Sequence, residues 1–344
     1  MISIGIIGGS GYTGRKILEF ISNHPHIAEY TVYGNTTAGQ NLHSLFPDLA
    51  GITEDSKIGS VNEISAAHDL YFIALPHGEA LNFVPTLIEN KKKVIDLGGD
   101  YRLDSASEYE TWYKLKHNSA DLLDSKLYGL ADLSFLNYEG IELIANPGCY
   151  PTATALGLLP LVTEMADDIL TVSTVAYSGT SGAGKSPKAD LLMSEMYGNV
   201  RAYNVNNHRH QPEILQTLKK AGFNSPFSFT THLLPAAAGI YATTSVHMQY
   251  NMSRMDLTDL YKGYYSRSPF VRIRNTAPDL SWAVGTNFCD INISVKDSTI
   301  IITSAIDNLI KGAAGQAVQN MNKLFGWDER TGLLNSGVKN VQVY

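Results

Sequence analysis

The chain has 344 residues, of which 44% are hydrophobic and 17% are charged, and its formal net charge is −7. A length of this order favours two domains over a single core, and the composition is typical of a globular protein. The acidic balance argues against nucleic-acid binding, and no apolar run approaches the roughly 18 residues of a membrane span. Because the first residues also lack a signal-peptide pattern, we expect a cytoplasmic protein with neither nucleic-acid nor membrane partners.

Only two cysteines, Cys149 and Cys289, occur in the chain. This number fits a reducing compartment and excludes a disulfide framework. Cys289 lies in an alternating stretch of apolar and polar residues that is typical of a strand, so we interpret it as structural. Cys149 stands in a different context, between a Pro-Gly turn and a helix-like segment.

The predicted elements begin with a buried strand at residues 4–7. A glycine-rich loop follows, and a helix-like segment runs from Arg15 to Ser22. Gly9, Gly11 and Gly14 match the G-x-G-x-x-G fingerprint in the strand-to-helix context that dinucleotide-binding folds require. Such a loop lets the backbone approach a pyrophosphate at a helix N-terminus, whereas the alternative is a plain tight turn. The predicted cofactor contacts here are Gly8, Ser10, Gly11, Tyr12, Thr13 and Gly14.

The next strand, at residues 30–33, is expected to end near the adenosine ribose. Enzymes that use NAD usually place a carboxylate there to hold the ribose 2′-hydroxyl. This chain has Gly34-Asn35-Thr36-Thr37 instead. Hydroxyl and amide groups tolerate a 2′-phosphate, so Thr36 and Thr37 favour NADP over NAD.

Two more buried strands are expected at residues 70–74 and 94–97, and each runs into a turn. In a doubly wound parallel sheet, such turns lie at the edge where ligands bind. Pro76 is therefore a predicted cofactor contact, and Arg102 a predicted clamp for phosphate or carboxylate, with a surface ion pair as the alternative. The first half of the chain is thus predicted to be an α/β domain of the Rossmann type.

Cys149 follows an apolar run at residues 141–145 and the turn residues Asn146, Pro147 and Gly148. A helix-like segment at 152–159 begins just after it, which predicts that Cys149 lies at a helix N-terminus. Unpaired backbone N–H groups and the helix dipole favour a thiolate there, so the pKa can fall below the value of about 8.5 for a free thiol. These features favour a nucleophile. The alternative is a small buried apolar side chain.

The predicted strand at residues 170–177 leads into a second glycine-rich loop. Residues 179–186 match the phosphate-binding loop G-x-x-x-x-G-K-S of ATPases and GTPases. Such proteins also need a strand that ends in a magnesium-binding aspartate, and the stretch from Ile300 to Asp307 fits this poorly. We favour a loop that offers backbone N–H groups to a nicotinamide cofactor or to the phosphate of a substrate.

His208 and His210 flank Arg209 in a polar window that starts at Tyr203. No acidic cluster or cysteine pair lies near them in the sequence, so a metal site is not expected. A general acid or base is the favoured function, because an unperturbed histidine titrates at about 6.5. A structural histidine pair remains the alternative.

Alternating segments at residues 241–248, 288–295 and 299–304 predict an antiparallel sheet in the second half of the chain. A final helix-like stretch at 313–325 is expected to return to the first domain. We therefore expect an NADP-binding domain over residues 1–147, a catalytic α+β domain with a mainly antiparallel sheet over 148–312, and a returning C-terminal segment over 313–344.

Taken together, these residues resemble the N-acetyl-γ-glutamyl-phosphate reductases, the NADPH-dependent enzymes of arginine biosynthesis. This family lies within the wider group of aspartate-semialdehyde and glyceraldehyde-phosphate dehydrogenases. The resemblance runs nearly end to end and is most specific at residues 146–152, 182–184, 208–210 and 307–312. It implies that a small acyl phosphate is reduced to a semialdehyde through a thioacyl enzyme, and that the chain forms a homodimer or homotetramer.

The resemblance also implies roles for single residues. Cys149 is the expected nucleophile, His208 the general acid or base and His210 a substrate contact, with the reverse allocation of the two histidines left open. Arg102 is expected to bind the phosphate of the substrate. The other expected cofactor contacts are Ser181, Gly182, Gly184 and Asn308, and the other expected substrate contacts are Asn146, Ser178 and Tyr203.

Two positions depart from the family pattern. Ala238 stands where the family usually has an arginine near the substrate carboxylate, and Ala131-Asp132 replaces Pro-Glu. The first departure leaves open a different N-acyl group or the carrier-linked aminoadipyl phosphate of a lysine pathway. A phosphate-loop NTPase and a non-catalytic sensor that binds the cofactor are the remaining alternatives. Other cations that could replace the arginine are Lys185, Arg201 and Arg209.

Overall fold

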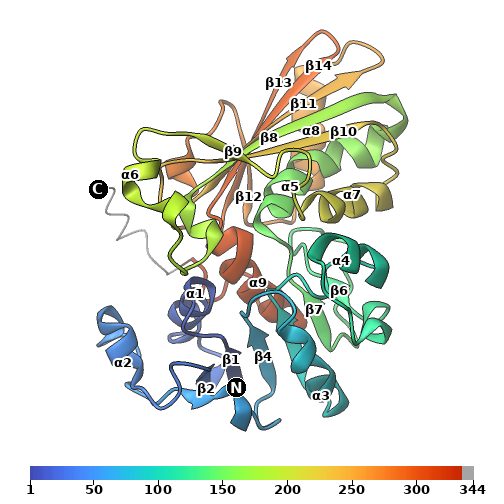
Figure 1. Ribbon diagram of the computed structural model, residues 1–344. Coiled ribbons are helices and arrows are strands. Elements are labelled where there is room, and N and C mark those ends of the chain that lie inside the picture. Colours follow the sequence, from blue (N-terminus) through green and yellow to red (C-terminus); the bar gives the residue numbers. More distant parts are fainter. Residues whose placement is uncertain (335–344) are drawn as a thin grey trace. The chain divides into compact units, whose positions relative to one another are not determined.

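The computed structural model describes residues 1–334, which fold as two compact units (Figure 1). Unit 1 comprises residues 1–131 and 136–147 together with the described residues from Ala313 onward. Unit 2 comprises residues 132–135 and 148–312. Residues 335–344, the end of the C-terminal segment expected at 313–344, lie outside the described residues.

Unit 1 contains a parallel sheet of seven strands in the order β3-β2-β1-β4-β5-β7-β6. This order is that of a doubly wound fold, in which the chain starts in the middle and winds to both edges. The predicted doubly wound sheet is therefore confirmed. The strands are β1 (Ile2–Ile7), β2 (Ile27–Gly34), β3 (Gly59–Ser60), β4 (Leu70–Ile73), β5 (Lys93–Asp96), β6 (Leu127–Tyr128) and β7 (Leu143–Ala145).

The helices of unit 1 include one from the C-terminal part of the chain. They are α1 (Tyr12–Ile21), α2 (Leu42–Leu45), α3 (Val84–Glu89), α4 (Ala106–Tyr113) and α9 (Gly315–Leu324), the last preceded by a π-helical turn at Ile310–Ala314. Helix α9 contacts α1 and β5. Nearly all its residues are buried, so it forms part of the core of unit 1.

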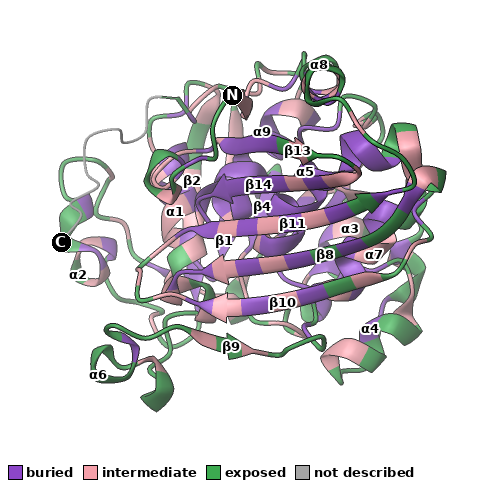
Figure 2. Ribbon diagram, turned by 90° about the horizontal axis from the view of Figure 1, so that it is seen from above, coloured by how far each residue is buried: buried purple, intermediate pink, exposed green. Residues whose placement is uncertain are grey.

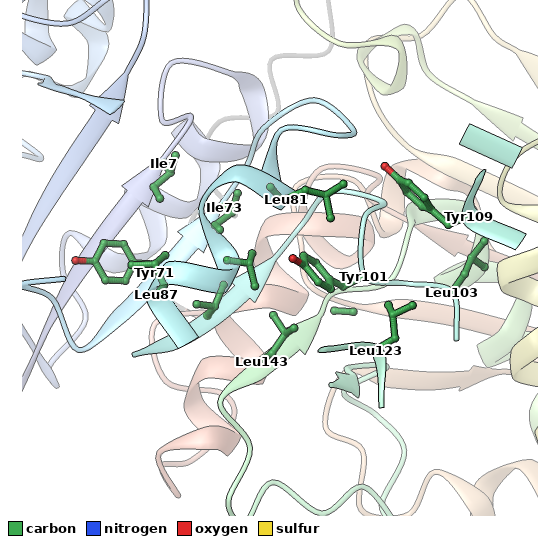
Figure 3. Close-up of a cluster of buried hydrophobic side chains, with 14 of the residues drawn as sticks. Ile7, Tyr71, Ile73, Leu81, Leu87, Tyr101, Leu103, Tyr109, Leu123 and Leu143 are labelled. Atoms are coloured by element: carbon green, nitrogen blue, oxygen red, sulfur yellow. The ribbon is translucent and has the colours of Figure 1, made fainter. Parts of the chain in front are cut away.

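Central strands of the sheet supply the core of unit 1 with apolar side chains. Strand β4 is buried at every position because helices cover both faces of a parallel sheet. Figure 3 shows part of this core, in which Ile7, Ile73 and Leu143 from β1, β4 and β7 belong to one cluster with Tyr101 and Leu87. The continuous apolar runs that predicted these strands therefore follow from burial on both faces.

Unit 2 contains a mixed sheet of seven strands in the order β12-β13-β14-β11-β8-β10-β9. The pairs β13-β14, β14-β11, β11-β8 and β10-β9 are antiparallel, while β12-β13 and β8-β10 are parallel. The predicted mainly antiparallel sheet is confirmed, and Figure 2 shows its strands side by side. The strands are β8 (Ile169–Ser178), β9 (Arg201–Tyr203), β10 (Phe227–Leu233), β11 (Ile240–Met248), β12 (Val271–Arg274), β13 (Cys289–Lys296) and β14 (Thr299–Ile306).

One long helix, α5 (Cys149–Met165), packs against the sheet of unit 2 and against two other helices. The sequence prediction for this helix was too short, because it ended at Leu159 before Pro160. The helix continues through Pro160, since almost every side chain from Tyr150 to Val162 is buried and this packing outweighs the lost backbone hydrogen bond. The other helices of unit 2 are α6 (Met193–Met196), α7 (Gln211–Lys220) and α8 (Arg254–Tyr264).

Among residues 1–334, no helix has both the length and the apolar character needed to cross a membrane.

Candidate active site

Cys149 is the first residue of α5, and Gly148 is the N-cap of that helix. The predicted position of this cysteine at a helix N-terminus is therefore confirmed. Its side chain is partly exposed, whereas Cys289 is fully buried at the start of β13. Burial raises the pKa of Cys289 strongly, so of the two thiols only Cys149 has an environment suited to a thiolate.

A buried carboxylate holds the backbone just before Cys149. Oε1 of Glu213 accepts a hydrogen bond of 2.8 Å from the N–H of Gly148, and Glu213 has no exposed surface. The carbonyl of Gly148 in turn accepts from the backbone and the hydroxyl of Thr152, each at 2.9 Å. Glu213 lies in the first turn of α7. Both the N–H and the carbonyl of Gly148, the residue before the cysteine, are thus held by hydrogen bonds.

Tyr150, Tyr203 and the two histidines lie together in unit 2. The hydroxyl groups of Tyr150 and Tyr203 are 2.9 Å apart, and the ring of Tyr150 packs edge-on against His208 and His210 at centroid distances of 5.3 and 6.0 Å. Burial raises the pKa of Tyr203 to about 12, so its phenol stays protonated at neutral pH. Because Tyr150 follows Cys149, the aromatic cluster lies beside the start of the nucleophile helix.

His208 is uncharged at neutral pH. Burial, with a further contribution from the neighbouring Arg209, lowers the pKa of His208 to about 4. Its Nδ1 accepts a hydrogen bond of 3.1 Å from the backbone N–H of His210, which leaves the ring proton on Nε2. From the sequence, His208 is expected to titrate at the ordinary histidine pKa of about 6.5. The lower pKa could not be predicted, because only the fold decides that this ring is buried.

The glycine-rich loop after β8 does not have the geometry of an NTPase phosphate loop. In such a loop the Lys-Ser pair starts an α-helix, whereas here a 3₁₀ turn at Thr180–Ala183 is followed by exposed irregular chain at Lys185. The N–H groups of Thr180 and Ser181 donate to the carbonyls of Ala236 and Ala237 at 2.9 and 3.0 Å. The loop is thus fastened to the segment that contains Ala238.

Asn308 fastens the same loop from the other side. Its Nδ2 donates to Oγ of Ser181 at 3.0 Å, and its Oδ1 accepts from the N–H of Gly239 at 2.6 Å. Ser178, at the end of β8, is buried, and its hydroxyl donates to the carbonyl of Gly179 at 2.9 Å. Gly182 and Gly184 are exposed, and Gly184 has a φ of +87°, in the left-handed region.

The loop between β1 and α1 fits a dinucleotide. A methyl group on Gly8 would lie 2.5 Å from the carbonyl oxygen of Ala74, and one on Gly14 would lie 2.5 Å from Cα of Gly9. Helix α1 begins just after Gly11, and no side chain caps its first N–H groups in this part of unit 1. The close packing and the uncapped helix N-terminus suit a pyrophosphate that approaches the backbone. The side chains of Ser10 and Thr13 are half-buried and that of Tyr12 is exposed.

The turn after β2 carries no carboxylate. Thr36 is exposed, and the hydroxyl oxygen of Thr37 is buried without a hydrogen-bond partner among the described residues. Pro76 is exposed in the turn after β4, next to the Ala74 carbonyl that Gly8 approaches. Thr36 and Thr37 follow the carboxyl end of β2 and Pro76 follows that of β4, the two strands that flank β1, at the edge where a doubly wound sheet binds its ligand.

Arg102 is a buried residue of unit 1, so the alternative of a surface ion pair is wrong. Its Nε donates to the carbonyl of Asn146 at 2.9 Å and its Nη2 to that of Leu97 at 2.7 Å. Asn146 is also buried, and its amide donates to the carbonyl of Ala313 at 3.2 Å and accepts from Asn320 at 3.1 Å. Both side chains thus hold the chain just before the cysteine.

Sequence reasoning missed several of these residues. Glu213 stands three positions after His210, at the start of a helix, which is the spacing of a capping carboxylate and was the available signal. Lys311 and Asp132 form a fully buried ion pair, and no sequence pattern pairs them. Within residues 1–334, no group of three or more histidine, cysteine or acidic side chains is arranged to hold a metal ion.

Comparisons with known proteins cover nearly the whole chain. Residues 3–144 match the model of the semialdehyde dehydrogenase NAD-binding domain, and residues 149–308 match that of the semialdehyde dehydrogenase dimerisation domain. The chain is 41% identical over 339 residues to the N-acetyl-gamma-glutamyl-phosphate reductase of Chlorobaculum tepidum, with 97% of each chain covered. It is 40% identical over 340 residues to the enzyme of the same name from a Geobacillus species, with 97% and 98% covered.

Solved structures agree on the fold. The aspartate semialdehyde dehydrogenase II of Vibrio cholerae, complexed with ASA, superposes with a TM-score of 0.73 at 15% identity, covering 95% of this chain and 98% of that one. The aspartate semialdehyde dehydrogenase of Candida albicans with NADP gives a TM-score of 0.65 at 14% identity, covering 95% and 99%. At these identities the likeness concerns the fold alone.

Proposed function

The chain belongs to the N-acetyl-γ-glutamyl-phosphate reductases, and on this basis we propose that it reduces N-acetyl-γ-glutamyl phosphate to N-acetylglutamate 5-semialdehyde and phosphate with NADPH. The observation that carries the proposal is the partly exposed Cys149 at the N-terminus of a buried helix, whose next residue, Tyr150, packs against two buried histidines. An acyl phosphate needs a nucleophile that expels phosphate, and a thiolate at a helix N-terminus supplies one.

In the first step, the thiolate of Cys149 attacks the acyl carbon. A carbon–sulfur bond forms, the carbon–oxygen bond to phosphate breaks, and phosphate leaves with the electron pair. The N–H groups in the first turn of α5 stabilise the oxyanion that develops, an effect typically worth about 3 kcal/mol for each well-placed donor. Arg102 is the residue we assign to the phosphate, because a guanidinium matches its oxygens with two parallel donors.

The second step reduces the thioester. When bound, the nicotinamide cofactor supplies a hydride to the thioester carbon. His208, which is neutral because its pKa is lowered, donates a hydrogen bond from its Nε2–H to the oxyanion of the hemithioacetal. The oxyanion then re-forms the carbonyl as the carbon–sulfur bond breaks, so the semialdehyde leaves and Cys149 regains its thiolate with no net transfer of a proton. His210 and Tyr203 are the side chains that we assign to the substrate, together with Asn146 and Ser178.

A nicotinamide cofactor follows from the match of residues 3–144 to an NAD-binding domain. Our assignment of NADPH rather than NADH is supported by Thr36 and Thr37. A carboxylate in that turn would repel a 2′-phosphate, and the turn has none. We assign the loop residues Gly8 to Gly14 to the pyrophosphate. The second glycine loop, with Ser181, Gly182, Gly184 and Asn308, and the turn at Pro76 complete the proposed cofactor site.

We also propose that the chain acts as a homodimer or homotetramer in the cytoplasm. The match of residues 149–308 to a dimerisation domain supports self-association. Leu192, Met193 and Tyr197 are large apolar side chains that are more than half exposed, and clusters of this kind often mark an interface. Sedimentation of the purified protein would measure the assembly, and a monomer at micromolar concentration would contradict this part of the proposal.

The reverse reaction tests the function. Purified protein receives N-acetylglutamate semialdehyde, phosphate and either NADP or NAD, and reduction of the cofactor is followed by absorbance. A rise that depends on phosphate and is faster with NADP would support the substrate and the cofactor together. No rise from protein that binds NADPH would refute the acetyl substrate, and other N-acyl or carrier-linked semialdehydes would then be assayed because Ala238 replaces an arginine of the family.

A further inference from the structure

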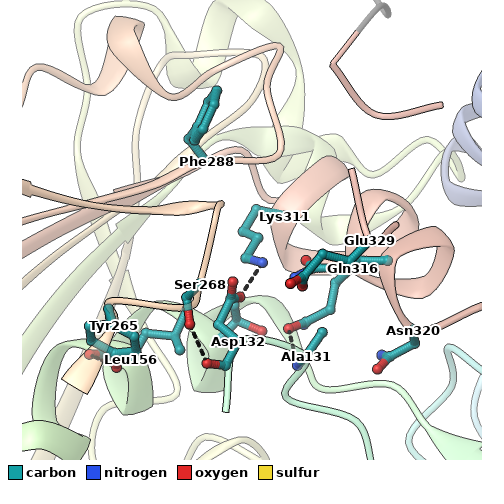
Figure 4. Close-up of polar contacts among 12 residues, drawn as sticks. Ala131, Asp132, Leu156, Tyr265, Ser268, Phe288, Lys311, Gln316, Asn320 and Glu329 are labelled. Carbon is teal, nitrogen blue, oxygen red and sulfur yellow. Dashed lines mark hydrogen bonds and ion pairs between the residues drawn. The ribbon is translucent and has the colours of Figure 1, made fainter. Parts of the chain in front are cut away.

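Unit 2 contains a buried ion pair that the proposed mechanism does not use. Nζ of Lys311 pairs with Oδ2 of Asp132 (Figure 4). Neither side chain has any exposed surface. The carbonyl of Asp132 accepts a hydrogen bond of 2.6 Å from Ser268, and Nζ of Lys311 lies 5.5 Å from the ring centroid of Phe270. A buried ion pair is often no more stabilising than apolar side chains of similar size. Its placement therefore calls for a reason other than stability.

The residue after Lys311 lies against the nucleophile. A methyl group built on Gly312 would lie 2.6 Å from Cβ of Cys149 and 3.0 Å from its Cα. Real Cβ atoms do not come this close, so Gly312 is in direct contact with the backbone and the side-chain root of Cys149. No residue other than glycine fits there without a shift of the cysteine or of the turn.

The turn that carries Lys311 and Gly312 is held at its start as well. The carboxylate of Asp307 accepts from the N–H groups of Leu309 and Ile310 at 2.8 and 3.0 Å, and from that of Gly285 at 2.8 Å. The carbonyl of Asp307 accepts from the N–H of Gly312 at 2.9 Å. The turn at Ile310–Ala314 is π-helical, a rare conformation that is frequent at functional sites.

We propose that residues 307–312 form a strap that positions Cys149, with Gly312 as the contact and the Lys311–Asp132 ion pair as the anchor. The inference rests on the proposed role of Cys149 as nucleophile. An attacking atom must be held close to its productive position, and a displacement of about 1 Å can lower a rate roughly 100-fold. The strap confines the cysteine through the contact of Gly312 with its Cα and Cβ. The ion pair gives the strap one position because a lysine without its partner would leave a charge buried.

Gly312→Ala tests the contact, and Gly263→Ala is its matched control, because a methyl group on Gly263 in α8 would have no atom within 4 Å. We expect Gly312→Ala to lower kcat about 100-fold, with KM for the semialdehyde and binding of NADPH little changed. Gly263→Ala should keep the wild-type kcat. Wild-type kcat in Gly312→Ala would overturn the inference.

Alkylation by iodoacetamide measures the position of the thiol without any turnover. It reports on Cys149 alone, since Cys289 is fully buried. The plot of alkylation rate against pH should shift in Gly312→Ala and coincide with wild type in Gly263→Ala. This measurement needs no substrate, so it tests the strap independently of the proposed function. The covalent route of the proposed function is tested separately, because it would be refuted if Cys149→Ser retained turnover.

The anchor is tested by replacing both charges at once. The double variant Asp132→Leu/Lys311→Met keeps an apolar pair of similar size and avoids an unpaired buried charge. We expect it to fold, to bind NADPH and to show a kcat about tenfold below wild type, while Asp132→Glu, which keeps the ion pair, recovers most of the rate. A wild-type kcat and alkylation profile in the double variant would overturn the role of the anchor. If the double variant does not fold, Gly312→Ala still decides the inference.

Discussion

Glu213 offers the sharpest test of how the nucleophile turn is built. Its carboxylate has no exposed surface and accepts from the N–H of Gly148 at 2.8 Å. Replacement by alanine removes a hydrogen bond to a charged acceptor, worth about 1.5–3 kcal/mol, and leaves the N–H buried without that acceptor. Replacement by glutamine keeps a neutral acceptor of similar shape, worth about 0.5–1.5 kcal/mol.

The two variants should therefore differ from each other as well as from the wild type. We expect Glu213→Ala to be less stable than Glu213→Gln by about 1 kcal/mol, which corresponds to about 2–4 °C in the Tm of a domain of 150–250 residues. The turnover number should fall further in the alanine variant, because Gly148 is the N-cap of the helix that starts at Cys149.

Calorimetry and the reverse reaction measure both effects on the same samples, with binding of NADPH as a check on unit 1. If the alanine variant melted at or above the temperature of the glutamine variant, or if both kept the wild-type kcat, the hydrogen bond to Gly148 would not hold the turn. Glu213 would then not account for the position of Cys149 at the start of α5.

Three further predictions follow from the site. Cys149→Ser should abolish turnover while binding of NADPH persists, and a rate near that of wild type would refute the thioacyl route. Burial lowers the pKa of His208 to about 4, so the unfolded chain binds a proton at a higher pH than the folded chain does. The stability of the fold that depends on a neutral His208 is therefore fully present above a pH of about 6.5 and is lost as the pH falls to about 4. His208→Asn should flatten stability against pH in that window and lower kcat strongly, whereas an unchanged kcat would assign the hydrogen bond to the oxyanion to His210. Thr37→Asp should weaken binding of NADP more than that of NAD by electrostatic repulsion of the 2′-phosphate, as measured by the ratio of the two kcat/KM values, and an unchanged ratio would contradict the assigned position of the ribose.

Local patterns explain which parts of the fold could be predicted. A strand buried on both faces is a continuous apolar run, and glycine and proline punctuate the turns, so the strands around residues 4–7 and 70–73 and the helix start at Cys149 were identified. The length of α5 was not, because Pro160 normally ends a helix and only the burial of the residues from Tyr150 to Val162 carries this one past it.

The sequence by itself determined the central strands of the first sheet, its doubly wound class and the family, since these depend on residues close together in the chain or on motifs kept as a whole. Only the tertiary structure decided the environments of the side chains. It brings Glu213 to Gly148, Gly312 to Cys149 and Lys311 to Asp132. The last two residues are 179 positions apart in the chain (311 − 132). Burial then makes His208 neutral, because desolvation and pair interactions depend on distances in space that no spacing along the chain encodes.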